Sequence, residues 1–156
     1  MKKVISILAV IVLSTSMVWA KPVKGVNSYS GCTVEELRKM TKGTPMQGCE
    51  QAILDIEKEY QINAFFTCAV ALTETGMGKT GVGASRNNLF GMRGSKGFYW
   101  YDSPEESIRA FGGCIYRVYW KNGRKTLPRI AEWYCDSSWA KTVERYINYL
   151  FGKVTE

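Results

Sequence analysis

The 156-residue sequence contains no histidine, and this absence excludes several kinds of active site. Hydrolases with a histidine-containing catalytic triad, HExxH zinc enzymes and Cys/His zinc fingers all need that side chain. No Cys-x-x-Cys pair occurs either, and the sequence shows no internal repeat. Carboxylates, tyrosines, lysines and backbone dipoles are therefore left for any chemistry, and no metal site is expected.

Cysteine is present in an odd number, which excludes a fully paired disulfide framework. The five residues are Cys32, Cys49, Cys68, Cys114 and Cys135. Cys32 and Cys49 flank a short helical segment, so we expect a disulfide between them, which would stabilise the fold by about 3 kcal/mol. Cys68 lies within an apolar helix and is expected to be a buried thiol.

No apolar run is long enough to be a convincing membrane span. The first twenty residues instead have the pattern of a secretory signal peptide: Lys2 and Lys3, an apolar stretch over residues 4–13, and the small-residue cleavage site Val18-Trp19-Ala20. We expect cleavage before Lys21, with an uncleaved anchor as the alternative. The product would be a monomer located in the periplasm, the cell wall or the medium, with no span left.

The net charge is +7, and removal of Lys2 and Lys3 leaves +5. The basic residues are scattered and form no run of the kind that binds nucleic acid, so no nucleic-acid partner is expected. A mildly basic exported protein suits polyanionic cell-wall polymers. The 136 residues after the signal are enough for one domain with a single core.

Helical signals dominate the rest, and we predict a mainly α domain with at most a small β element. Residues 21–31 are polar and glycine-containing, and are expected to be poorly ordered. Thr33 with Glu36 forms a capping-box pattern, Thr44-Pro45 predicts a second helix start, and Ser103-Pro104 predicts another. Further helices are predicted at 127–134 and 138–151, and an extended segment only at 97–101.

The central stretch, residues 63–94, is NAFFTCAVALTETGMGKTGVGASRNNLFGMRG. Asn63 is placed to cap a helix buried on all sides, which Gly76 and Gly78 end. Glu74 falls in the last turn, where the helix dipole and apolar neighbours should raise its pKa and make it a proton donor. The alternative is that Glu74 is simply the first solvated residue after a core helix. We expect a glycine-rich loop from Gly76 to Asn88. A dinucleotide-binding site would need a strand before these glycines and a helix after them, and neither is predicted here.

Two motifs in this stretch, Thr-Glu-Thr-Gly-Met-Gly and the Asn-Leu-Phe-Gly (NLFG) loop that begins at Asn88, resemble the glucosaminidase family of peptidoglycan hydrolases. That family is glycoside hydrolase family 73, of the flagellar and autolysin type. A weaker likeness continues through Tyr101-Asp102-Ser103, Glu106-Ser107-Ile108 and Ala140-Lys141. The resemblance implies a lysozyme-like single domain over residues 32–156. It also implies Glu74 as general acid, the β-1,4 bonds of peptidoglycan glycan strands as substrate, and no cofactor.

The NLFG loop supplies three candidate substrate-binding residues. The Asn88 amide suits an N-acetyl group, Phe90 is expected to pack the loop against the domain, and Gly91 allows close backbone approach. Trp100 and Tyr134 are the aromatic candidates for packing against sugar rings.

A second catalytic carboxylate is not obvious, and Asp102, at the end of the extended segment, is the one candidate. We expect Glu74 to work instead with the substrate's own N-acetyl group or with a loosely held water. A lytic transglycosylase with a single Glu is the nearest alternative function. A non-catalytic wall-binding module is the alternative from another class.

Overall fold

The computed structural model describes residues 25–155, so the predicted signal peptide at 1–20 lies outside the described residues. This part of the chain contains seven α-helices, a π-helical and a 3-10 segment, and one two-stranded sheet. In chain order these are α1 (Val34–Thr41), α2 (Glu50–Tyr60), α3 (Ala64–Thr75), α4 (Gly81–Arg86), β1 (Arg93–Gly94), β2 (Gly97–Phe98), α5 (Pro104–Cys114), η1 (Ile115–Tyr119), η2 (Trp120–Asn122), α6 (Leu127–Tyr134) and α7 (Ser137–Thr155). Over residues 25–155, no helix combines the length and the apolar character needed to cross a membrane.

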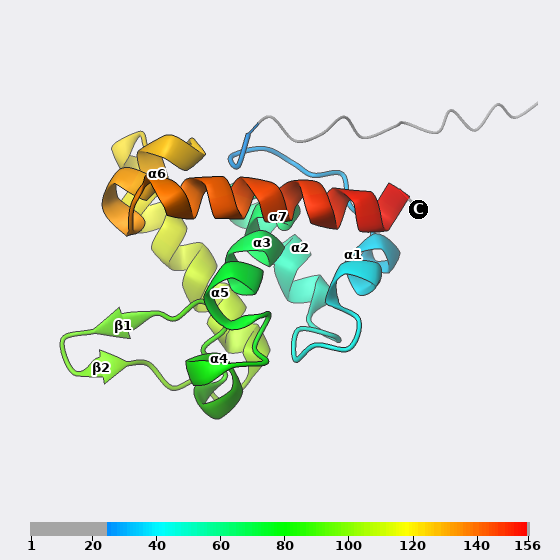
Figure 1. Cartoon of the computed structure of the whole chain (residues 1–156), viewed down its shortest axis with the longest axis horizontal. Coiled ribbons are helices and arrows are strands. Elements are labelled where there is room, and N and C mark those ends of the chain that lie inside the picture. The colour runs from blue at the N-terminus through cyan, green and yellow to red at the C-terminus, as the bar shows by residue number, and fades with distance from the viewer. Residues whose placement is uncertain (1–24, 156) are drawn as a thin grey trace, which may run out of the picture.

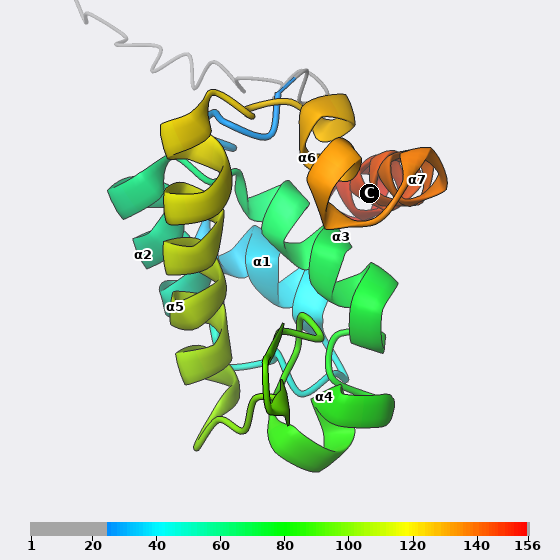
Figure 2. The same cartoon turned by 90° about the vertical axis from the view of Figure 1, so that its left-hand side faces the viewer.

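Helix α3 runs through the middle of the domain. It packs along α7, while α2 packs along α5. Figure 2 shows α7 on one side of α3 and the α2–α5 pair on the other. The Asn63 side chain accepts hydrogen bonds from the backbone N–H groups of Phe65 and Phe66, at 2.9 and 3.4 Å. Every residue from Ala64 to Ala71 is buried, so the predicted capped core helix is confirmed.

The segment before α1 is packed rather than free, which corrects the expectation of poor order for residues 25–31. Val26 is buried, and its carbonyl accepts the N–H of Asn63 at 3.0 Å. Ser30 donates to the carboxylate of Glu57 through its N–H, at 2.7 Å, and through its hydroxyl, at 3.0 Å. Glu57 also accepts the N–H of Ala64, the first residue of α3, at 2.9 Å. One carboxylate thus joins the N-terminal segment to the start of the central helix.

Two local predictions are wrong. The helix predicted to start at Thr44-Pro45 begins only at Glu50, because residues before it form turns and Gly48 has φ of +96°. The expected glycine-rich loop contains the short helix α4, whose Gly83 lies so close to Thr75 that a Cβ there would be 2.6 Å from the threonine side chain. Glycine therefore serves helix packing here, not flexibility.

Most other boundaries are confirmed, but two elements differ from the prediction in length. Thr33 and Glu36 form a complete capping box. Ser103 caps α5 by accepting the N–H of Glu106, and Pro104 is the first helical residue. Helix α6 has the predicted bounds, and α7 extends somewhat beyond them. The extended segment is reduced to a small hairpin in which Arg93 pairs with Phe98 and Gly94 with Gly97, and this β1–β2 hairpin projects from the helical body (Figure 1).

The predicted disulfide between Cys32 and Cys49 is not formed, and all five cysteines are free thiols. The two side chains lie in different surroundings. Burial, and then the nearby Glu105 of α5, raise the pKa of Cys49 to about 12. Burial raises the pKa of Cys32 to about 11; a hydrogen bond with Ser30 opposes this rise, and the charges of Glu36 and Glu57 add to it. Flanking one short helix in sequence did not bring these two thiols together.

The role of Glu57 gives a first testable prediction. Glu57→Gln replaces the charged acceptor of two buried N–H groups with a neutral amide oxygen, and its NH2 group forces the Ser30 hydroxyl to turn from donor to acceptor, so the free energy of unfolding should fall by about 1 kcal/mol or more. Urea unfolding followed by circular dichroism measures this. The matched control is Glu59→Gln, at an exposed position on the same helix, which should change stability by less than about 0.5 kcal/mol. Equal losses for the two variants would contradict the bridging role.

Candidate active site

Glu74 lies in the last turn of α3, as predicted, and its side chain is half-buried. Gly76 then adopts a left-handed conformation with φ of +57°, and its N–H reaches the carbonyls of Ala71 and Leu72. This ends the helix just after the carboxyl. Burial raises the pKa of Glu74, and a hydrogen bond from Trp139 opposes that rise. The carboxyl is therefore both accessible and biased toward its protonated form.

Trp139, in the first turn of α7, is the side chain that holds Glu74. Its indole Nε1–H donates to Oε1 of Glu74 at 2.8 Å. The indole is 6% exposed and stacks on the ring of Tyr134, with centroids 4.5 Å apart and an interplanar angle of 26°. Because Oε1 receives this bond, Oε2 is the oxygen left free to carry and donate a proton.

Gly91 lies beside that second oxygen. A Cβ built on Gly91 would be 3.5 Å from Oε2 of Glu74, and its φ is +60°. A side chain at this position would be strained and would also stand against the carboxyl. Glycine thus keeps a side chain away from Oε2, and the close approach of the backbone to a substrate stays a prediction.

Helices α3 and α5 hold the loop that carries Gly91. The Leu89 carbonyl accepts the hydroxyl of Thr75 in α3 at 2.7 Å, and the Leu89 N–H donates to the hydroxyl of Ser107 in α5 at 3.1 Å. The ring of Phe90 stacks on Phe111 of α5, with centroids 3.9 Å apart. These contacts fix the loop against the end of α3, where Glu74 lies.

Asn88 and Phe90 have structural roles within the domain. Asn88 is fully buried, and its amide donates to the carbonyls of Met92 and Tyr99, at 2.7 and 3.1 Å, and accepts the N–H of Met92 at 2.8 Å. The amide is occupied within the protein, so the expected contact with an N-acetyl group is corrected to a clamp on the hairpin. Phe90 is buried in the core, which leaves its side chain no face for substrate.

Tyr134 lies next to Glu74, whereas Trp100 and Asp102 do not contact it. The Tyr134 hydroxyl donates to the carbonyl of Phe90 at 3.3 Å, and burial, followed by the charge of Glu74, raises its pKa. It stays a neutral donor. Trp100 is on the hairpin side and is 69% exposed. Asp102 is exposed, and its backbone N–H donates to Glu106 at 2.8 Å.

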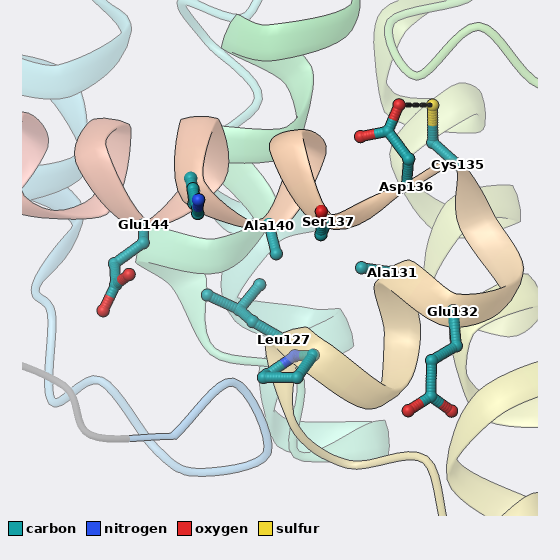
Figure 3. A pocket seen from close by; sticks show the side chains of 10 residues that line it. Leu127, Ala131, Glu132, Cys135, Asp136, Ser137, Ala140 and Glu144 are labelled. Carbon is teal, nitrogen blue, oxygen red and sulfur yellow. Dashed lines mark hydrogen bonds between the residues drawn. The ribbon is translucent and has the colours of Figure 1, made fainter.

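A hollow of about 550 Å³ lies between α6 and α7, but Glu74 is not among its lining residues. Figure 3 shows Leu127, Ala131 and Ala140 in this hollow, with Asp136 near its edge. Asp136 accepts the Ser138 hydroxyl at 2.6 Å and the N–H groups of Trp139 and Ser138 at 3.1 and 2.7 Å, and these bonds lower its pKa. It acts as the cap of α7 and so fixes the turn that carries Trp139.

The arrangement supports proton transfer by one carboxyl. In residues 25–155, no group of three or more Asp, Glu or Cys side chains is placed to hold a metal ion. Trp139 anchors one oxygen of Glu74, and a general acid would carry its proton on the other.

A helical domain that presents a half-buried carboxyl at a helix end has the architecture of lysozyme-like glycosidases. The family profile described as glucosaminidase, mannosyl-glycoprotein endo-β-N-acetylglucosaminidase, matches residues 50–152, and the chain therefore belongs to the glucosaminidase family. Comparison with curated protein sequences finds no match.

Solved structures of Staphylococcus aureus autolysin E share the fold. The complex of that protein with the muropeptide NAM-L-Ala-D-iGlu aligns with a TM-score of 0.71 and 18% identity, over 82% of this chain and 70% of the other. A catalytic mutant of autolysin E in complex with the disaccharide NAG-NAM gives the same values. A further autolysin E structure aligns with a TM-score of 0.70 and 19% identity, over 82% and 69% of the two chains.

Trp139 is the site residue that sequence reasoning missed. It lies 65 positions from Glu74, and no local pattern connects the two. The Asp136 cap two residues before the predicted helix start could have placed Trp139 in a first turn, but it could not have indicated which helix end that turn meets.

The Trp139 bond gives a second testable prediction. Trp139→Phe keeps a ring in the stack but deletes the N–H, so the pKa of Glu74 should rise above that of the parent, because the opposing hydrogen bond to the ionised form is lost. NMR titration of ¹³C-labelled glutamate carboxyls measures the shift. Trp133→Phe, at an exposed position on α6, is the control and should leave the titration unchanged. An unchanged or lowered pKa in Trp139→Phe would show that the bond does not act on the carboxyl.

Proposed function

We propose that the chain is an exported peptidoglycan hydrolase that cleaves β-1,4 bonds of the glycan strand on the reducing side of N-acetylglucosamine. Family membership supports the bond type, and the autolysin E complexes with muropeptide and disaccharide support the substrate class. The carrying observation is the Glu74 carboxyl, held by Trp139 through Oε1, with Oε2 beside Gly91.

In this mechanism Glu74 first acts as acid. Protonated Oε2 donates its proton to the glycosidic oxygen, the bond from C1 of N-acetylglucosamine to that oxygen breaks, and the departing sugar leaves as an alcohol. Trp139 then stabilises the carboxylate that remains, since its N–H bond favours the ionised form. A water adds to C1 and returns a proton to Glu74, which restores the starting state.

The group that stabilises C1 is proposed to be the substrate's own N-acetyl oxygen or a loosely held water. Asp102 is the candidate second carboxylate, which would act either as a nucleophile or as a base that activates a water. Its contacts support neither role. Its side chain makes no hydrogen bond or ion pair within the described part of the chain. Its backbone is instead tied to Glu106 and to the Asn87 amide. A mechanism with one protein carboxyl is one of the routes known for glycosidases.

Two other functions share parts of this site. A lytic transglycosylase would use the same acid but close a 1,6-anhydro ring in place of adding water. A wall-binding module would need no acid, and the raised pKa of Glu74 disfavours it, because carboxyls with perturbed pKa values are typical of catalytic sites.

Glu74→Gln gives the third prediction. The amide keeps the shape and an oxygen for the Trp139 bond but has no proton to donate, so the rate of wall degradation should fall at least about 100-fold. Turbidity of a cell-wall suspension measures the rate, and circular dichroism and melting establish that the variant is folded. Glu144→Gln, at an exposed site on α7, is the matched control with full activity expected. Activity of Glu74→Gln within about tenfold of the parent would refute the assignment.

Asp102→Asn gives the fourth. With Glu74 as the single essential carboxyl, this variant should retain activity within about tenfold of the parent in the same assay. If a folded Asp102→Asn protein is as inactive as Glu74→Gln, a paired-carboxylate mechanism replaces the one proposed.

A further inference from the structure

The β1–β2 hairpin and the residues that follow it expose more aromatic surface than any structural need explains. Phe98, Tyr99 and Trp100 are successive in sequence and are 40, 50 and 69% exposed. Exposed aromatic clusters of this kind mark binding surfaces more often than single exposed rings do. We call residues 93–100 the arm.

The arm also concentrates positive charge. The Arg93 guanidinium lies 5.5 Å from the centroid of the Phe98 ring, and the Arg86 guanidinium lies 5.1 Å from that of Trp100. Lys96 is exposed at the turn between the strands. The ion pairs of the described residues involve none of these three cations. Their charges are thus available to an anionic ligand.

The arm is held in a fixed place relative to the site. Asn88 clamps its base through the carbonyls of Met92 and Tyr99, and the N–H of Tyr99 donates to the Met92 carbonyl at 3.1 Å. Arg86 donates to the Phe98 carbonyl at 2.9 Å. Gly91, beside the Glu74 carboxyl, directly precedes this clamped base. The arm therefore extends from the edge of the site and need not be ordered by the ligand.

We propose that the arm binds the peptide-bearing sugar of the strand, with its aromatic rings on the sugar and Arg93 and Lys96 on carboxylates of the attached peptide. This inference rests on the proposed function and adds a substrate preference to it. The muropeptide bound by autolysin E ends in D-isoglutamate, an acid of the required kind. An uncharged N-acetylglucosamine polymer would engage the rings but leave the cations without partners.

The test combines a charge-removing variant with a charge-removing substrate. Arg93→Gln/Lys96→Gln removes two charges but keeps Arg86, which holds the hairpin. Cell walls are used as isolated and after carbodiimide-coupled amidation with ammonia, which converts peptide carboxylates to amides and leaves the glycan intact. Binding is measured by co-sedimentation in a Glu74→Gln background, so that the walls stay undigested, and hydrolysis is measured separately with Glu74 present.

On untreated walls the arm variant should bind roughly fivefold more weakly, as expected for two exposed ion pairs. On amidated walls the parent should bind as weakly as the arm variant. Lys39→Gln/Lys42→Gln is the matched control, because it removes the same charge from exposed positions in α1 and at its C-cap, and α1 lies on the opposite side of the molecule from the hairpin (Figure 1). It should bind untreated walls like the parent.

Three results would overturn the inference. The first is that the arm variant loses as much binding on amidated walls as on untreated walls, and the second is that the control variant loses as much binding as the arm variant. The third is that binding of the parent falls when hydrofluoric acid removes phosphodiester polymers but not when the walls are amidated. The last would assign the arm to a phosphate polymer. Failure of the parent to hydrolyse walls, with arm-dependent binding intact, would refute the proposed function and not this inference.

Discussion

The hydrogen bond from Trp139 to Glu74 is the interaction on which the account of this site depends, because it links the end of α3 to the start of α7. It anchors one carboxyl oxygen and so leaves the other for chemistry. It also opposes the rise in pKa that burial causes. An acid in a glycosidase must hold its proton before bond cleavage and tolerate its loss afterwards. Burial favours the first state and the indole N–H stabilises the second.

The rest of the fold serves to bring these two helix ends and one loop together. Helix α3 is apolar on all sides, so it lies at the centre, and its end is the one place where a carboxyl can reach solvent. The loop that ends at Gly91 is fixed by Thr75 and Ser107 from two different helices. Asp136 fixes the first turn of α7. Each of these supports is a short-range contact, but together they set the distance between residues far apart in sequence.

Sequence reasoning succeeded where the signal was local. Asn63 as a cap, Glu74 in the last turn and the bounds of α6 all follow from residue type and spacing over a few positions. It failed where the answer depends on which elements meet. The amide of Asn88 suits a ligand by chemistry alone, but it is buried by the hairpin that folds back over it, and Trp139 acquires its role from a partner 65 positions away.

The central claim is that Glu74 drives hydrolysis of the bond on the reducing side of N-acetylglucosamine, and isotope labelling tests it most directly. Cell walls are digested in H₂¹⁸O and the released fragments are sequenced by mass spectrometry. The account predicts one ¹⁸O atom at the reducing end of N-acetylglucosamine, with no such product from Glu74→Gln. Unlabelled 1,6-anhydro ends, or label on the other sugar of the strand, would contradict it.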